Sequence, residues 1–127
     1  MIDITKIKDT GFMTHNGLYI VDVKENYAKI GVDITEKSLN PFGIVHGGLI
    51  YTLADSVMGI SLATSGRSGV TVNSTIDYLS PGKGKKLFAE TEIIKDGKTI
   101  VVLRATIKDE NDTLVAVSNG TYYLINK

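Results

Sequence analysis

The chain has 127 residues, with 14 lysines and arginines, 14 aspartates and glutamates, and no cysteine. This length predicts a single domain over residues 1–127 that is large enough to bury a core of its own. The balanced charge excludes a basic field that could hold a nucleic-acid backbone, and the missing cysteines exclude disulfides and zinc–thiolate sites. We therefore expect no nucleic-acid partner, and the cysteine-free composition fits a cytoplasmic protein.

Neither a secretory signal nor a membrane span is predicted. The first twenty residues mix charged with apolar positions and hold no apolar block, so they do not form a signal peptide. The apolar run over residues 49–63 is too short for an ordinary bilayer crossing and carries Asp55 near its middle. We expect no membrane partner.

The first third of the chain predicts a β-hairpin. Residues 1–16 carry only a weak amphipathic pattern, and we leave them unassigned. Apolar residues then alternate with polar ones over residues 18–24 and 27–35, which is typical of strands with one buried face. The dipeptide Glu25-Asn26 between the two runs indicates a tight hairpin turn.

One long helix is predicted over residues 48–64, after a loop that contains Pro41 and Gly43. Its apolar positions repeat at helical spacing and cover most of the circumference, so we expect the helix to be surrounded by the rest of the fold. Ser65-Gly66 supplies a C-terminal cap. The remaining face carries four small or polar residues, which are Thr52, Asp55, Ser56 and Gly59.

Four more strands are predicted after the helix, over residues 70–80, 87–94, 99–107 and 114–125. Asp96-Gly97 is a strong signal for a two-residue hairpin between the second and third of these strands. This order is α+β, and it predicts one antiparallel sheet of about five or six strands curled around one central helix.

The start of the predicted helix is suited to hold a developing negative charge. Gly47 and Gly48 expose backbone N–H groups at the positive end of the helix dipole. Asp55 lies on an otherwise apolar helix, where a carboxylate is costly unless it is paired or used in chemistry. Taken alone, each feature also has a structural interpretation: a turn for the glycines, a helix-entry hydrogen bond for His46 and a satisfied carboxylate for Asp55. We interpret Tyr122-Tyr123 as strand packing.

These candidate groups are too far apart to act on one substrate within one chain. A helix rises about 1.5 Å per residue, which puts Asp55 roughly 10 Å along the axis from the Gly48 N–H. Attack and polarisation each need contacts of about 3 Å to the same carbonyl group. If both act, we expect a homodimer in which Asp55 of one subunit meets Gly47 and Gly48 of the other across a two-fold axis.

The combination resembles the hotdog-fold thioesterases of the phenylacetic-acid-degradation (PaaI-like) branch. That family has an Asn, a short loop to His-Gly-Gly, and Leu-Ala-Asp on the helix, and this chain matches at Asn40, His46-Gly47-Gly48 and Leu53-Ala54-Asp55. The similarity continues through residues 74–81 and 96–99 to the last predicted strand. It implies a hotdog-fold acyl-CoA or aryl-CoA hydrolase that needs no metal or cofactor, since coenzyme A is part of the substrate. It also implies a homodimer, often paired into a homotetramer.

The resemblance implies a role for each candidate residue. The Gly47 N–H, supported by His46 and Asn40, would polarise the thioester carbonyl. Asp55 of the facing subunit would act as a base on water or as a nucleophile, and Thr71 would help to position that water. Contacts to the substrate or to its CoA part would come from Gly48, Asn73, Ser80, Pro81, Gly97 and Lys98.

Two other functions on the same fold remain as alternatives. One is a non-catalytic module that binds or senses acyl-CoA, and the retained Asp55 carboxylate argues against it. The other is a hydratase or dehydratase, which needs a catalytic His paired with an acid. His15 lies in the unassigned segment, so we predict no such pair. The sequence leaves three alternatives open: which acyl group is accepted, whether the substrate is a CoA or a carrier-protein thioester, and how the dimers pair.

Overall fold

The computed structural model describes residues 11–126. The elements, in order, are α1 (Phe12–His15), β1 (Leu18–Lys24), β2 (Tyr27–Asp33), the 3-10 turn η2 (Glu36–Ser38), α2 (Gly47–Ala63), β3 (Ser68–Tyr78), β4 (Lys86–Asp96), β5 (Ile100–Asp109) and β6 (Leu114–Asn126). Residues 1–10 lie outside the described residues. They are part of the segment for which we predict no signal peptide.

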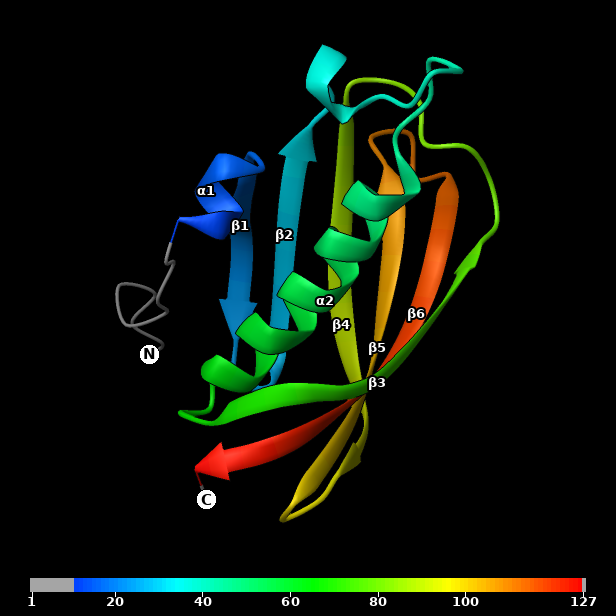
Figure 1. The fold of residues 1–127 in the computed structure, drawn as a ribbon. Coiled ribbons are helices and arrows are strands. Elements are labelled where there is room, and N and C mark those ends of the chain that lie inside the picture. Colours follow the sequence, from blue (N-terminus) through cyan, green and yellow to red (C-terminus); the bar gives the residue numbers. More distant parts are fainter. Residues whose placement is uncertain (1–10, 127) are drawn as a thin grey trace.

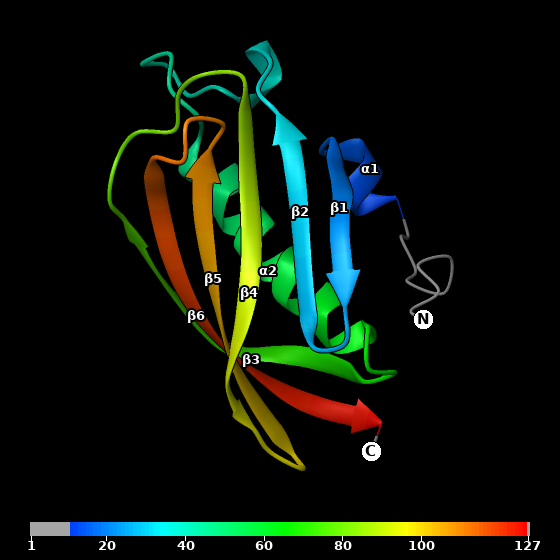
Figure 2. The same cartoon turned by 180° about the vertical axis from the view of Figure 1, so that it is seen from behind.

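The strands form one antiparallel sheet of six, in the order β1-β2-β4-β5-β6-β3. The sheet is strongly curved, and α2 lies diagonally across its inner face (Figures 1 and 2). β1 and β3 are the two edges of the sheet. The predicted α+β architecture, one sheet curled around one long helix, is therefore confirmed.

Side chains on the inner side of α2 fill the space between helix and sheet. Leu53 and Val57 are fully buried and belong to the same apolar cluster as Ile30 of β2 and Leu103 of β5. The expectation that the helix is surrounded is wrong for a single chain, because the sheet covers only one side of it. The outer face stays partly exposed, and it carries Thr52, Asp55, Ser56 and Gly59.

Turn chemistry explains where several elements stop. Asn26 adopts a left-handed φ of 62° and joins β1 to β2 in the predicted two-residue hairpin. The β4–β5 hairpin is also present, but three residues, 97–99, separate its strands instead of two. After α2, Gly66 has a φ of 76°, and the chain turns so that the Arg67 N–H donates to the Leu62 carbonyl at 3.2 Å.

The two shortest elements, α1 and η2, were not predicted. They contain 4 and 3 residues, which is too few to show a hydrophobic period. In the part of the chain that the structure describes, no helix combines the length and the apolar content of a membrane span.

Candidate active site

The start of α2 is capped by the side chain of His46. This residue is extended, and its Nδ1 accepts a hydrogen bond from the Gly48 N–H at 2.8 Å. An acceptor Nδ1 places the proton of a neutral imidazole on Nε2. The Gly47 N–H has no hydrogen-bond partner among the described residues. It is therefore the glycine donor that remains available to a ligand oxygen.

One side chain lies next to each glycine, Tyr78 beside Gly47 and His46 beside Gly48. A Cβ at Gly48 would lie 2.9 Å from His46 Nδ1, so a larger residue would displace the imidazole from its cap. The Tyr78 hydroxyl donates to the Gly47 carbonyl at 2.9 Å. Because Tyr78 is the last residue of β3, this bond fixes the first residue of α2 to the edge strand.

Asn40 closes the loop that leads to His46. Its Oδ1 accepts the N–H groups of Phe42 at 2.9 Å and Ile44 at 3.3 Å. The His46 N–H in turn donates to the Ser38 carbonyl at 2.8 Å. In the single chain Asn40 thus acts on His46 indirectly, because it holds the loop in shape.

Asp55 lies two turns further along α2, on its partly exposed face. Its Oδ1 accepts hydrogen bonds from the Thr71 hydroxyl at 2.8 Å and the Tyr122 hydroxyl at 2.6 Å. Oδ2 has no hydrogen-bond partner within residues 11–126. The structure therefore brings together Asp55 and Thr71, which the resemblance had paired, and it adds Tyr122.

Tyr122 was interpreted as strand packing, and this interpretation missed its polar contact. The side chain is 2% exposed and comes from β6. Burial, and then the Asp55 carboxylate, raise the pKa of the Tyr122 phenol. The sequence gives no signal for this contact, because it depends on how α2 crosses the sheet.

A cavity of about 480 Å³ lies beside Asp55, between α2 and the edge strand β3. Tyr51 and Ser56 line it from the helix, and Thr71 and Asn73 line it from the strand. The predicted contact residues Asn73 and Gly48 both border this cavity. It therefore offers room for a substrate next to the carboxylate.

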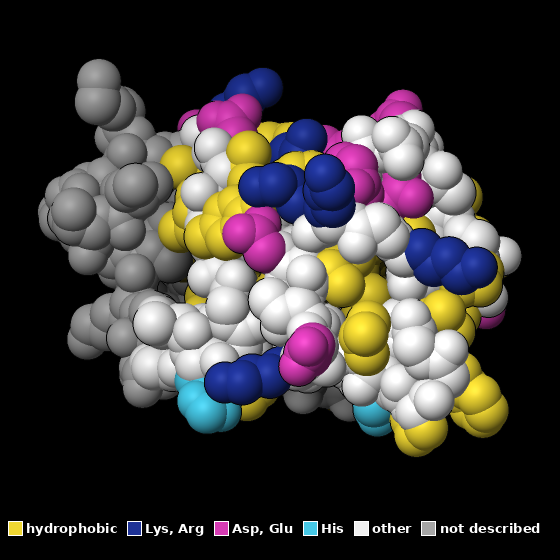
Figure 3. Space-filling view, turned by 90° about the horizontal axis from the view of Figure 1, so that it is seen from above, with side chains coloured by type: hydrophobic (Ala, Val, Ile, Leu, Met, Phe, Trp, Pro, Cys, Tyr) yellow, Lys and Arg dark blue, Asp and Glu magenta, His cyan; other side chains and the backbone are white. Residues whose placement is uncertain are grey.

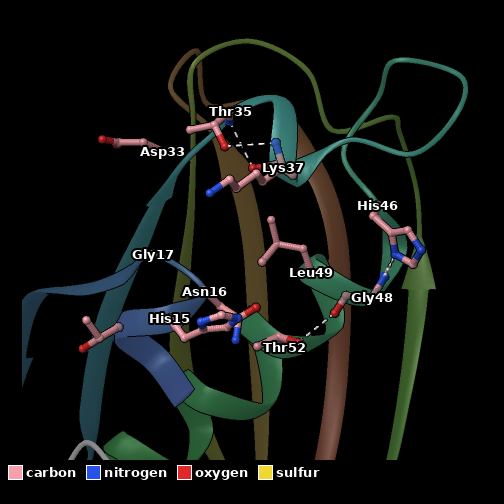
Figure 4. Close-up of a pocket in the computed structure, with 12 residues that line it drawn as sticks. His15, Asn16, Gly17, Asp33, Thr35, Lys37, His46, Gly48, Leu49 and Thr52 are labelled. Atoms are coloured by element: carbon pink, nitrogen blue, oxygen red, sulfur yellow. Dashed lines mark hydrogen bonds between the residues drawn. The ribbon is translucent and has the colours of Figure 1, made fainter. Parts of the chain in front are cut away.

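A second, more polar recess of about 570 Å³ lies on the other side of the helix start, between α1, the end of β2 and η2 (Figure 4). His15 and His46 both line it, and Figure 3 shows both histidines of the chain along one edge of this end of the molecule. Asp33 also lines it, but its carboxylate is bound to the Tyr19 hydroxyl at 2.9 Å and to Lys86 at 3.2 Å. These two partners lower the pKa of Asp33. Within the described residues, neither histidine bonds to an acid.

The remaining predicted CoA contacts do not meet in one chain. Ser80-Pro81 follows β3, which ends opposite Ala116 of β6, and Gly97-Lys98 precedes β5, which begins opposite Tyr123 of β6. Those two positions on β6 are seven residues apart, or about 23 Å at the rise of a strand. A Cβ at Gly97 would also collide with the Ile100 carbonyl, so the turn itself requires this glycine.

Comparison with known proteins identifies similar sequences and structures. The model of the thioesterase superfamily matches residues 42–116. Acyl-coenzyme A thioesterase PaaI of Escherichia coli (strain K12) is 29% identical over 110 residues, covering 86% of this chain and 79% of that protein. The solved structure of E. coli PaaI has a TM-score of 0.90 at 25% identity and covers 96% of this chain and 89% of that one.

Two streptococcal structures add information about a ligand and about residues. A Streptococcus mutans UA159 protein bound to acetyl CoA has a TM-score of 0.82 at 30% identity, over 87% of this chain and 90% of that one. A hypothetical thioesterase from Streptococcus pneumoniae TIGR4, solved as an Asp-to-Ala mutant, has a TM-score of 0.82 at 26% identity, over 87% and 92% of the two chains. A Thr-to-Ala mutant of that protein was also solved. Its mutated Asp and Thr are sixteen residues apart, the separation of Asp55 and Thr71 here.

Proposed function

The chain belongs to the thioesterase superfamily, and we propose that it hydrolyses acyl-CoA or aryl-CoA thioesters to the free acid and coenzyme A. The observation that carries this proposal is the Asp55 carboxylate, which borders a cavity. Two hydroxyl donors hold one of its oxygens, and the other oxygen has no partner among the described residues. The relatives named as an acyl-CoA thioesterase and solved with acetyl CoA support the substrate class. Coenzyme A enters with the substrate, and the reaction needs no metal or cofactor.

In the proposed reaction, the Gly47 N–H polarises the thioester carbonyl. Acting as a base, Asp55 takes a proton from a water whose oxygen adds to the carbonyl carbon. The tetrahedral intermediate then expels the CoA thiolate, which takes up the proton that Asp55 had accepted. Acting as a nucleophile, Asp55 adds to the carbonyl carbon and expels the CoA thiolate, and water then hydrolyses the resulting mixed anhydride to the free acid and the Asp55 carboxylate. In both routes negative charge develops on the carbonyl oxygen, where a fixed N–H donor lowers the barrier. His46 and Asn40 keep that donor in place, and Thr71 helps to position the water.

The distance along α2 supports a site that is shared between two subunits. Asp55 is roughly 10 Å from the N–H groups at the start of its own helix, so the proposed enzyme is a homodimer with its α2 helices antiparallel. The open outer face of α2 supports this arrangement, since a Cβ at Gly59 would meet nothing within 4 Å of it in the single chain. β3 supports it too, because this edge strand of 11 residues exposes Val70 and Val72. Two such dimers would form the proposed homotetramer.

The same dimer accounts for the separated CoA contacts. If the two β3 edges pair antiparallel, the end of one β3 lies beside the start of the other. The start of β3 pairs with the end of β6, which is also the partner of the start of β5. The Ser80-Pro81 corner of one subunit would then approach the partner subunit's Lys98 and Gly97. A lysine there offers a phosphate one point charge.

We also propose a cytoplasmic location and one hotdog domain over residues 1–127. The absence of cysteine supports the reducing compartment. The long sheet that packs on α2 supports the single domain.

The test of the proposed function is the release of free thiol from a panel of CoA thioesters. We expect turnover by the wild type and a loss of at least about 10²-fold in kcat for Asp55→Asn. Asp22→Asn, which changes an exposed carboxylate on β1, is the matched control and should keep wild-type kcat. An unchanged kcat in Asp55→Asn would remove the assigned role. Tight binding of CoA esters without thiol release by the wild type would instead favour the non-catalytic module.

A further inference from the structure

The Tyr122 hydroxyl is the shortest polar contact of the Asp55 carboxylate. It lies 2.6 Å from Asp55 Oδ1 and 3.1 Å from the Asp55 backbone carbonyl oxygen. A carboxylate that accepts from a buried hydroxyl gains a strong, directional bond. This contact joins β6 to the middle of α2 at the residue on which the proposed hydrolysis depends.

Two glycines leave the space that the Tyr122 side chain occupies. A Cβ at Gly120 would lie 2.9 Å from Tyr122 Cε1, and a Cβ at Gly69 would lie 3.3 Å from Tyr122 Cβ. Gly120 therefore leaves room for the ring, and Gly69 leaves room for the Cβ of Tyr122, in a closely packed part of the core. A side chain that is fixed in this way can determine the rotamer of the group that it bonds.

Tyr122 and Thr71 act on the same carboxylate oxygen from neighbouring strands. They are Cα partners across the β3–β6 ladder, and their side chains emerge on the face that packs against α2. Both hydroxyls donate to Oδ1, so Oδ2 is the oxygen without a partner among the described residues. Because the pKa of the Tyr122 phenol is raised by burial and by Asp55, the phenol keeps its proton and stays a donor.

We propose that Tyr122 is a positioning residue for the hydrolysis: together with Thr71 it holds Asp55 in the one rotamer that presents Oδ2 to the cavity. This inference rests on the proposed function of Asp55. Tyr122 itself touches neither the water nor the thioester. Its effect therefore passes through Asp55 and should vanish when Asp55 no longer acts.

The test combines Tyr122→Phe with Asp55→Asn in the full-length chain. Tyr122→Phe keeps the ring and removes only the hydroxyl, and we expect kcat to fall about 10-fold or more with KM little changed, because a misaligned catalytic group costs turnover more than binding. In the Asp55→Asn background, Tyr122→Phe should cause no further loss of kcat. Tyr27→Phe is the matched control, since it removes the hydroxyl that donates to Glu90 at 2.8 Å on β4, away from the cavity. Thermal unfolding of both Phe variants shows that they are folded.

The outcomes separate this inference from the proposed function. Wild-type kcat in Tyr122→Phe, together with an inactive Asp55→Asn, would overturn the inference and leave the proposed function standing. The inference also fails if Tyr122→Phe lowers kcat by the same factor with and without Asp55, or if Tyr27→Phe lowers it equally. Wild-type kcat in Asp55→Asn would reject the assigned role of Asp55, and the role of Tyr122 with it, whereas a wild type that releases no thiol would reject the proposed function.

Discussion

The cap at the start of α2 can be tested by replacing His46. Its imidazole satisfies the Gly48 N–H at 2.8 Å and lies at an exposed site, so little packing is lost when the ring is removed. Loss of a side-chain N-cap costs about 1 kcal/mol of folding free energy, whereas Asn is among the best N-cap residues. We therefore expect His46→Ala to be about 1 kcal/mol less stable than the wild type and His46→Asn to be close to it.

The assay is urea unfolding followed by circular dichroism, at one chain concentration because the stability of an oligomer depends on it. For a domain of this size, about 1 kcal/mol corresponds to a Tm difference of about 4 °C. The Ala and Asn variants isolate the cap, since both lack the imidazole and only Asn retains an acceptor near the Gly48 N–H. Equal destabilisation of the two variants would refute the capping account of His46.

Two further predictions concern the dimer and the response to acid. Gly59→Leu places a bulky side chain on the open face of α2, where the single chain leaves free space. We expect a shift from dimer to monomer in sedimentation, with the circular dichroism spectrum retained. An unchanged dimer would contradict the proposed helix contact. The Lys85 N–H, at 2.7 Å from the Glu110 carboxylate, lowers the pKa of Glu110. A lowered folded-state pKa stabilises the fold above the ordinary value of 4.5, and this contribution is lost as the pH falls below it. Glu110→Gln should therefore lose less stability than the wild type over this acid range in urea titrations; equal losses would oppose the assignment.

The fold was predictable because its signals are local. Alternation of period two marked the strands, and the long apolar run from residue 49 marked α2, which the structure places at Gly47–Ala63. The open side of the helix could not be predicted, because an apolar circumference looks the same whether a sheet or another subunit covers it. Single-turn elements such as α1 carry no period and were missed.

The candidate site was predictable in part. The resemblance paired Asp55 with Thr71, and the structure joins them by a hydrogen bond. Tyr122 was missed because its contact depends on the crossing of α2 over β6, which no spacing in the sequence encodes. The predicted CoA contacts Ser80 and Lys98 lie at opposite ends of the sheet. The sequence could not show this separation, because each residue was inferred from its own motif and the strand register was unknown.

The central claim is that each active site takes Asp55 from one subunit and Gly47 from the other, and mixing two inactive variants tests it most directly. Gly47→Pro removes the N–H donor at the first helical position, where Pro is favoured, and the preceding His46 already has the extended φ of −61° and ψ of 132° that a following Pro prefers.

Refolding equal amounts of Gly47→Pro and Asp55→Asn chains together forms mixed dimers in which one of the two sites has both native groups. We expect thiol release to recover to about one quarter of the wild-type rate, since half of the dimers are mixed and each has one intact site. A mixture as inactive as its parents would contradict the shared site.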